Sequence, residues 1–164
     1  MKMPVVVPIV IPTKDQPWYK RAMKAFARRK WRLIEDYIFW IPSLGQWCKI
    51  PAPLDFDFAS VPRIFWPVLD PTGVLLIPSM PHDFGYRYGC LLLSDTKSGP
   101  WECVEMDRKA LDDLMHDLCN AINGTPVLSD LAWAAVRAGG YFTWKSWRDS
   151  KQSVFDDYPA AVVL

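Results

Sequence analysis

The chain contains little histidine and little net charge, and it has no apolar run long enough to cross a membrane. Its 164 residues include two histidines, and 19 basic side chains nearly balance 18 acidic ones, for a net charge of +1. Overall charge therefore does not draw the protein to nucleic acid, and we expect no nucleic-acid partner. A transmembrane helix needs about 20 consecutive apolar residues, so we expect no membrane span.

The four cysteines have no Cys-x-x-Cys spacing; they are Cys48, Cys90, Cys103 and Cys119. A zinc site built on cysteines is therefore not expected. The first 14 residues are apolar but interrupted by prolines, unlike the continuous apolar region of a secretory signal. We therefore expect reduced, buried thiols, although Cys103 could still lie close to Cys90 or to Cys119.

Residues 1–30 predict an arm followed by a short basic helix. The Val and Ile residues near the start favour an extended arm or an edge strand, where proline is tolerated. Over residues 13–30, Asp15 and Pro17 suit a helix start, and basic side chains surround a narrow apolar stripe. Such a helix can lie on anionic lipid or bind a partner protein; the alternative is a solvated surface helix.

Residues 31–150 predict a single α+β domain, which is long enough to bury a hydrophobic core. Strand-forming residues dominate 31–58, and Pro42–Gly45 predicts a turn, so we expect an N-terminal β-hairpin or small sheet. About three helices should follow. An irregular tail is expected over residues 151–164.

Three segments carry the helical signals. A helix is expected over residues 82–93, after Pro81. Apolar residues at helical spacing predict a second helix over 103–122, ended by Asn123–Gly124. A third is expected over 130–147, capped by Ser129 and loosened at Gly139–Gly140.

The segment "SMPHDFGYRYG" places His82 directly beside Asp83. Neighbouring residues on a helix point about 100° apart, so the two side chains serve different contacts. We expect His82 to face Asp107 on the next helix, because a carboxylate on one imidazole nitrogen fixes the tautomer and leaves the other nitrogen as a base. Asp83 would then face the loop that holds Asp57, and carboxylates with backbone carbonyls suit Ca²⁺.

Two resemblances rest on these motifs. The stretch "WCKIPAPLDFDFASVPRIFWP" followed by "HDFGYRYG" resembles domain-of-unknown-function family 1353, which is common in tailed bacteriophages; the likeness covers about residues 31–147. "HDFGYRYG" and "MDRKALDDLMHDLC" also resemble the two central helices of bacterial and fungal secretory-type phospholipase A2. The second resemblance implies a phospholipase A2-like helical core.

The phospholipase resemblance also implies catalytic roles. His82 would be the general base that activates water, and Asp107 its carboxylate partner. Tyr86 or Tyr88 would donate a hydrogen bond to the Asp107 carboxylate. Asp83 would bind Ca²⁺, together with Asp57 and the carbonyl of Phe58.

Two functions therefore remain open. The first is a phage-encoded, calcium-dependent, phospholipase A2-like ester hydrolase, which would act at a lipid or membrane surface or on another ester. The second is a non-catalytic virion protein of the tail that keeps the helical scaffold and binds other phage structural proteins. In both cases the chain would be made in the bacterial host cytoplasm, and it could be incorporated in the virion.

Overall fold

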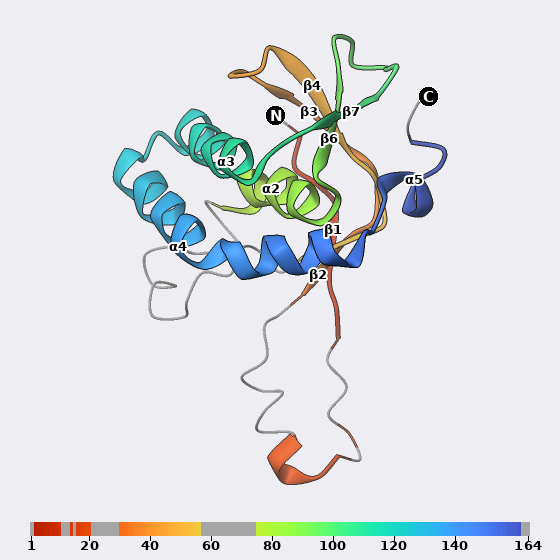
Figure 1. The fold of residues 1–164 in the computed structure, drawn as a ribbon, viewed down its shortest axis with the longest axis vertical. Helices are drawn as coiled ribbons and strands as arrows, with labels where there is room; N and C mark the ends of the chain where they lie inside the picture. The colour runs from red at the N-terminus through yellow and green to blue at the C-terminus, as the bar shows by residue number, and fades with distance from the viewer. Residues whose placement is uncertain (1, 11–13, 15, 21–29, 57–74, 162–164) are drawn as a thin grey trace.

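The computed structural model describes residues 2–10, 14, 16–20, 30–56 and 75–161. Two of the expected metal ligands, Asp57 and Phe58, lie outside these residues. So does most of the expected basic helix, of which residues 18–20 are described and are helical. In Figure 1 residues 18–20 lie at the far end of an arm, well away from the body of the protein.

The strands form two antiparallel sheets. The three-stranded sheet has the order β1-β2-β5, made by β1 (Val6–Pro8), β2 (Trp31–Leu33) and β5 (Leu54–Phe56). The four-stranded sheet has the order β3-β4-β6-β7, made by β3 (Tyr37–Ile41), β4 (Gln46–Ile50), β6 (Cys90–Ser94) and β7 (Glu102–Glu105). The expected edge strand near the N-terminus is confirmed as β1, and the expected hairpin with its turn at 42–45 is confirmed as β3–β4.

The helices follow the first strands, so the expected α+β class is confirmed. They are α2 (Leu76–Tyr88), α3 (Arg108–Asn123), α4 (Pro126–Ser150) and the short α5 (Val154–Asp157). In Figure 1 α2 lies in the middle of the body, with α3 and α4 beside it. Within the described residues, no helix has the length and apolar character that crossing a membrane requires.

The helix expected over residues 82–93 is shifted toward the N-terminus. It begins at Leu76 and ends at Tyr88, because Gly89 adopts a left-handed conformation (φ 74°) that closes the helix. The five residues after Gly89 are all buried and form β6, which pairs with β4 and β7. A short apolar run of this kind fits either a buried strand or a buried helix, and sheet pairing decided between them.

The second helix, predicted over residues 103–122, begins later than predicted. Residues 102–105 form β7, and Asp107 is the N-cap of α3, its side chain accepting a 2.7 Å hydrogen bond from the Ala110 amide. The predicted end is confirmed, since Gly124 (φ 61°) caps the helix after Asn123. The helix therefore starts five residues later than its periodicity suggested.

The third expected helix is longer than predicted. α4 starts at Pro126, a residue type suited to the first helical position. Ser129 is not the cap; it is buried in the first turn, and its hydroxyl donates to the Thr125 carbonyl at 3.0 Å. Gly139 and Gly140 do not interrupt the helix.

The C-terminal segment, expected to be irregular, contains α5 and is tied to the body. The Tyr88 hydroxyl donates to Asp157 at 2.6 Å, and the Tyr158 hydroxyl donates to the Pro53 carbonyl at 2.6 Å. Tyr158 is itself buried. Long-range aromatic contacts of this kind leave no local sequence pattern, which is why periodicity did not reveal them.

One cysteine pair is oxidised. Cys90 and Cys103 form a disulfide between β6 and β7, with Cα atoms 5.7 Å apart. The expectation of four reduced thiols is therefore wrong for this pair, which is one of the two pairs considered for Cys103. The other two cysteines, Cys48 and Cys119, are free and buried, as expected.

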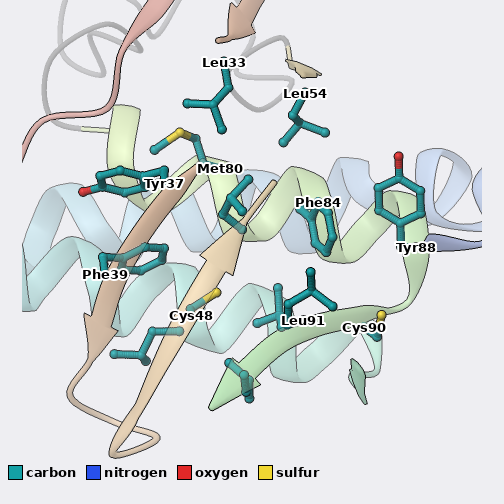
Figure 2. Packing of buried hydrophobic residues seen from close by; sticks show 14 of the residues in the cluster. Leu33, Tyr37, Phe39, Cys48, Leu54, Met80, Phe84, Tyr88, Cys90 and Leu91 are labelled. Atoms are coloured by element: carbon teal, nitrogen blue, oxygen red, sulfur yellow. The ribbon is translucent and has the colours of Figure 1, made fainter. Parts of the chain in front are cut away.

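The main core lies between α2 and the two sheets. Figure 2 shows Met80 and Phe84 of α2 among the side chains of Leu33, Tyr37 and Leu91 from the strands. All five residues are at most 5% exposed. This core holds α2 rigidly, and α2 carries His82 and Asp83.

Candidate active site

The imidazole of His82 is fixed by a carboxylate on the neighbouring helix. His82 Nε2 lies 2.8 Å from Asp112 Oδ1, and both side chains are buried, His82 at 4% exposure and Asp112 at 0%. His82 belongs to α2 and Asp112 to α3, two helices in extensive contact. A carboxylate at this nitrogen favours the tautomer in which Nε2 carries the proton.

Two further groups hold the Asp112 carboxylate. The Tyr86 hydroxyl donates to Oδ1 at 2.6 Å, and Arg137 of α4 donates to Oδ2 at 2.9 Å. Arg108, one turn before Asp112 on α3, contributes positive charge at 4.0 Å. A buried carboxylate is tolerated when it is paired and hydrogen-bonded in this way, so Asp112 is a fixed anion behind the imidazole.

Tyr86 also contacts the imidazole itself. It lies one helical turn after His82, so the two side chains share a face of α2. Their ring centroids are 4.1 Å apart. Tyr86 therefore restrains both members of the His82–Asp112 pair.

The second imidazole nitrogen has no hydrogen-bond partner among the described residues. His82 Nδ1 is buried, and the nearest carboxylate oxygen, Asp83 Oδ1, lies 3.6 Å away. That distance is beyond a hydrogen bond. The other carboxylate oxygen of Asp83, Oδ2, is also buried without a partner in the described part of the chain. Two adjacent residues of α2 thus each have a buried polar atom without a hydrogen bond in the described part of the chain.

A cavity of about 210 Å³ opens at this point. His82, Asp83, Tyr86 and Arg87 of α2 line it, with further residues of β5 and α4 and with Lys30. Arg87 is held in place, donating to the Asp55 carbonyl at 2.8 Å and lying 4.9 Å from the centroid of the Trp147 ring. His82 therefore lines a space that a small molecule or water can enter, while its Nδ1 atom is buried and makes no hydrogen bond among the described residues.

The electrostatics of the pair follow from burial and from the contacts. Burial acts to lower the pKa of His82, but the hydrogen bond to Asp112 and the charges of Asp83 and Asp112 outweigh it, so the pKa lies above its ordinary value. Burial acts to raise the pKa of Asp112, but hydrogen bonds from His82, Tyr86 and Arg137 outweigh it, so the pKa lies below its ordinary value. Asp112 thus stays ionised when His82 is neutral.

The expected pairing of His82 with Asp107 is wrong. Asp107 instead caps the N-terminus of α3, and the partner of His82 is Asp112. Tyr86 donates to Asp112 and not to Asp107, whereas Tyr88 donates to Asp157. The error follows from the start of α3, because a helix that begins at Arg108 turns its interior face toward α2 only after the first turn.

Asp112 could have been found from the pattern of α3. The buried positions of this helix include Leu111, Met115 and Cys119, which recur at helical spacing, and Asp112 lies among them. A charged residue on an otherwise apolar face requires a partner. Two other aspartates of α3 differ from Asp112, since Asp113 is partly exposed and Asp117 is exposed.

The described residues supply one metal ligand of the expected set. Asp83 Oδ2 is an unpaired buried carboxylate oxygen beside the cavity, which suits a hard cation such as Ca²⁺. Within the described residues, no group of three or more His, Cys, Asp or Glu side chains is arranged to hold a metal. Asp57 and Phe58, the other expected ligands, lie outside these residues.

The fold and site define an α+β protein with a buried His–Asp pair at the edge of a cavity. The sequence matches the family model described as "Protein of unknown function (DUF1353)" over residues 31–136. The match covers more than half of the 164 residues, so the chain belongs to this family, as the motifs indicated. The comparison with curated proteins and the comparison with solved structures each found no match.

Proposed function

We propose that the protein is an ester hydrolase in which His82 activates a water molecule. The observation that carries the proposal is the state of the two imidazole nitrogens. Nε2 is held by a buried carboxylate, whereas buried Nδ1 makes no hydrogen bond among the described residues, and His82 lines a cavity. Most buried side-chain polar atoms in proteins have a hydrogen-bond partner, so a buried imidazole nitrogen without one, on a residue that lines a cavity, favours a functional role over a structural one.

In this reaction neutral His82 accepts a proton at Nδ1 from water as the water oxygen bonds to the ester carbonyl carbon. The imidazolium that forms keeps its Nε2–H on Asp112, whose negative charge stabilises it. When the tetrahedral intermediate breaks its bond to the alcohol oxygen, Nδ1–H returns the proton to that oxygen. Tyr86 and Arg137 keep Asp112 ionised and in place throughout.

Calcium is part of the proposal, with Asp83 as the described ligand and with Asp57 and the Phe58 carbonyl as further ligands. When bound, Ca²⁺ supplies positive charge that polarises the ester carbonyl. The support within the described residues is the unpaired Oδ2 of Asp83 beside the cavity. The likeness to phospholipase A2 suggests a lipid ester, and the likeness to tailed-phage proteins suggests a phage source.

A test of the catalytic proposal compares the two histidines of the chain. His82→Gln keeps an amide that can donate to Asp112 but has no base, so ester hydrolysis should fall by about 10²–10⁴-fold. His116→Ala is the control, because His116 lies outside the cavity lining and contacts Asp130. Thermal unfolding of both variants separates loss of chemistry from loss of fold. Equal hydrolysis by wild type and His82→Gln would exclude His82 as the base.

A test of the metal uses calorimetric titration with Ca²⁺. The wild type should bind Ca²⁺, and Asp83→Asn, which keeps the shape of the side chain and removes its charge, should bind it far more weakly. Asp95→Asn is a control outside the cavity lining. An absence of binding by the wild type at millimolar Ca²⁺ would remove calcium from the mechanism and leave the role of His82 to be judged on hydrolysis alone.

A second proposal, an interaction module of the virion, rests on the arm. Several of its described apolar residues are exposed, among them Val10 at 83%, Trp18 at 81% and Tyr19 at 50%. Exposed aromatic residues are typical of protein interfaces. Detection of the chain in purified phage particles, and its loss from particles on Trp18→Ser with Tyr19→Ser, would support this role. Particles that contain no copy of the chain would argue against it.

A further inference from the structure

One face of α4 lines part of the cavity that His82 also lines. Of the cavity-lining residues on this helix, Ala135, Val136, Gly139, Gly140, Thr143 and Trp147, most are small or apolar. Their spacing of three to four residues places them along one side of the helix. This wall lacks charged side chains, in contrast to the α2 side, which carries His82, Asp83 and Arg87.

The two glycines in this wall have different surroundings. A Cβ atom built on Gly140 would lie 2.5 Å from the Tyr86 hydroxyl, so glycine is needed there for α4 to approach α2. Among the described residues, a Cβ atom on Gly139 would meet nothing within 4 Å. Glycine is unfavourable inside a helix relative to alanine. Packing accounts for Gly140 but not for Gly139, which is exposed and lines the cavity, so that a side chain there would enter open space.

The Nδ1 atom of His82, which makes no hydrogen bond among the described residues, suggests that this cavity binds a ligand. His82 is 4% exposed, lines the cavity and leaves Nδ1 without a partner among the described residues. Lys30 and Arg87 line the cavity too and bring positive charge beside the carboxylates of Asp55 and Asp83. The cavity therefore has a polar end with donors for a carbonyl or carboxylate oxygen, and a wall of small and apolar residues.

We propose that the cavity-facing side of α4 binds the apolar acyl chain of the ester, and that Gly139 determines the size of chain that enters. The inference deepens the proposed function and rests on it for the identity of the polar group. The carbonyl carbon lies at His82, and the chain extends from it along α4. The carboxylate product would bind in the same orientation, with its charge near His82, Lys30 and Arg87.

The first experiment measures binding without catalysis. Octanoate is titrated calorimetrically into the wild type, Gly139→Leu and Ala138→Leu. Ala138 is exposed and does not line the cavity, so Ala138→Leu is the matched control on the same helix. We expect Gly139→Leu to bind octanoate at least tenfold more weakly than the other two proteins. Equal binding by Gly139→Leu, or no binding by the wild type, would overturn the inference.

The second experiment measures hydrolysis of p-nitrophenyl acetate and p-nitrophenyl octanoate by the same three proteins. Gly139→Leu should lower kcat/KM for the octanoate ester at least tenfold more than for the acetate ester, and Ala138→Leu should lower neither. An equal loss on both esters would overturn the assignment of Gly139. If no protein hydrolyses either ester but octanoate binding depends on residue 139, the hydrolase proposal fails and the binding wall stands.

Thermal unfolding distinguishes a filled cavity from a loss of folded structure in Gly139→Leu. Because a Cβ at Gly139 has free space and leucine favours helix, Gly139→Leu should unfold no lower than the wild type. Weaker binding by a folded variant then reports occupation of the cavity. A variant that unfolds at lower temperature would show that residue 139 is packed, which contradicts the open space on which the inference rests.

Discussion

Asp112 Oδ1 of α3 lies 2.8 Å from His82 Nε2 of α2, although 30 residues separate the two in the sequence. The pair is buried, and Arg137 from α4 contacts the same carboxylate at 2.9 Å. Side chains of three helices, α2, α3 and α4, thus meet at the Asp112 carboxylate. Asp112 is therefore important both for the stability of the helical part and for the chemistry proposed for His82.

Asp112→Ala should destabilise the protein by about 3–5 kcal/mol, because it leaves Arg137 and His82 without their partner in a buried site. Asp107→Ala removes only a helix cap and should cost about 0.5–2 kcal/mol. Urea denaturation measures both. Ester hydrolysis should be lost in Asp112→Ala and retained in Asp107→Ala; the reverse result would restore Asp107 as the functional partner.

Gly139→Ala and Gly140→Ala should change stability in opposite directions. A methyl group at 139 has free space, so the gain in helix propensity should stabilise the protein by about 0.5–1 kcal/mol. A methyl group at 140 would collide with the Tyr86 hydroxyl, which donates to Asp112, and should cost about 1–3 kcal/mol. Equal shifts in the midpoint of urea denaturation would contradict the difference in packing.

Stability should depend on pH through the His82–Asp112 pair. The folded pKa of His82 is raised from its ordinary value of 6.5, so its stabilising contribution is complete below about pH 6.5 and is lost as the pH rises through the folded pKa. The free energy of unfolding of the wild type relative to His82→Gln should therefore decrease from pH 5.5 to 9. A constant difference would mean that the pKa of His82 is the same in both states.

Asp112 should act at the acid end of the range. Its folded pKa is lowered, so its contribution to the free energy of unfolding is present above the ordinary value of 3.8 and is lost as the pH falls through the folded pKa.

The pH dependence of hydrolysis should follow the protonation of His82. Since only neutral His82 accepts a proton, kcat/KM should rise with pH through the raised folded pKa of His82. A rate that falls over that interval would argue against a general base at this position.

The disulfide should stabilise the β6–β7 hairpin. The two free thiols should be inaccessible because they are buried. Cys90→Ser with Cys103→Ser should lower the free energy of unfolding by about 2–4 kcal/mol. In the native wild type a thiol reagent should react with neither Cys48 nor Cys119, which are buried, and in denaturant it should react with two thiols. Four reactive thiols in denaturant without reductant would show that the bond is absent.

Local signals predicted the parts of the fold that depend on neighbouring residues. The turn at 42–45 and the end of α3 at Gly124 follow from glycine conformation, and both are confirmed. The placement of His82 and Tyr86 on one face of a helix follows from their spacing. In contrast, the strand β6 was predicted as helix, because its apolar run has no period and its pairing with β4 and β7 is non-local.

The sequence by itself determined which side chains lie near one another on the helix: an imidazole, a carboxylate beside it and a tyrosine one turn later. Only the tertiary structure decided which carboxylate holds the imidazole. Asp107 and Asp112 are five residues apart, and the choice depends on where β7 ends and α3 begins. That boundary is set by sheet pairing and by the packing of α3 on α2, interactions between segments distant in the chain.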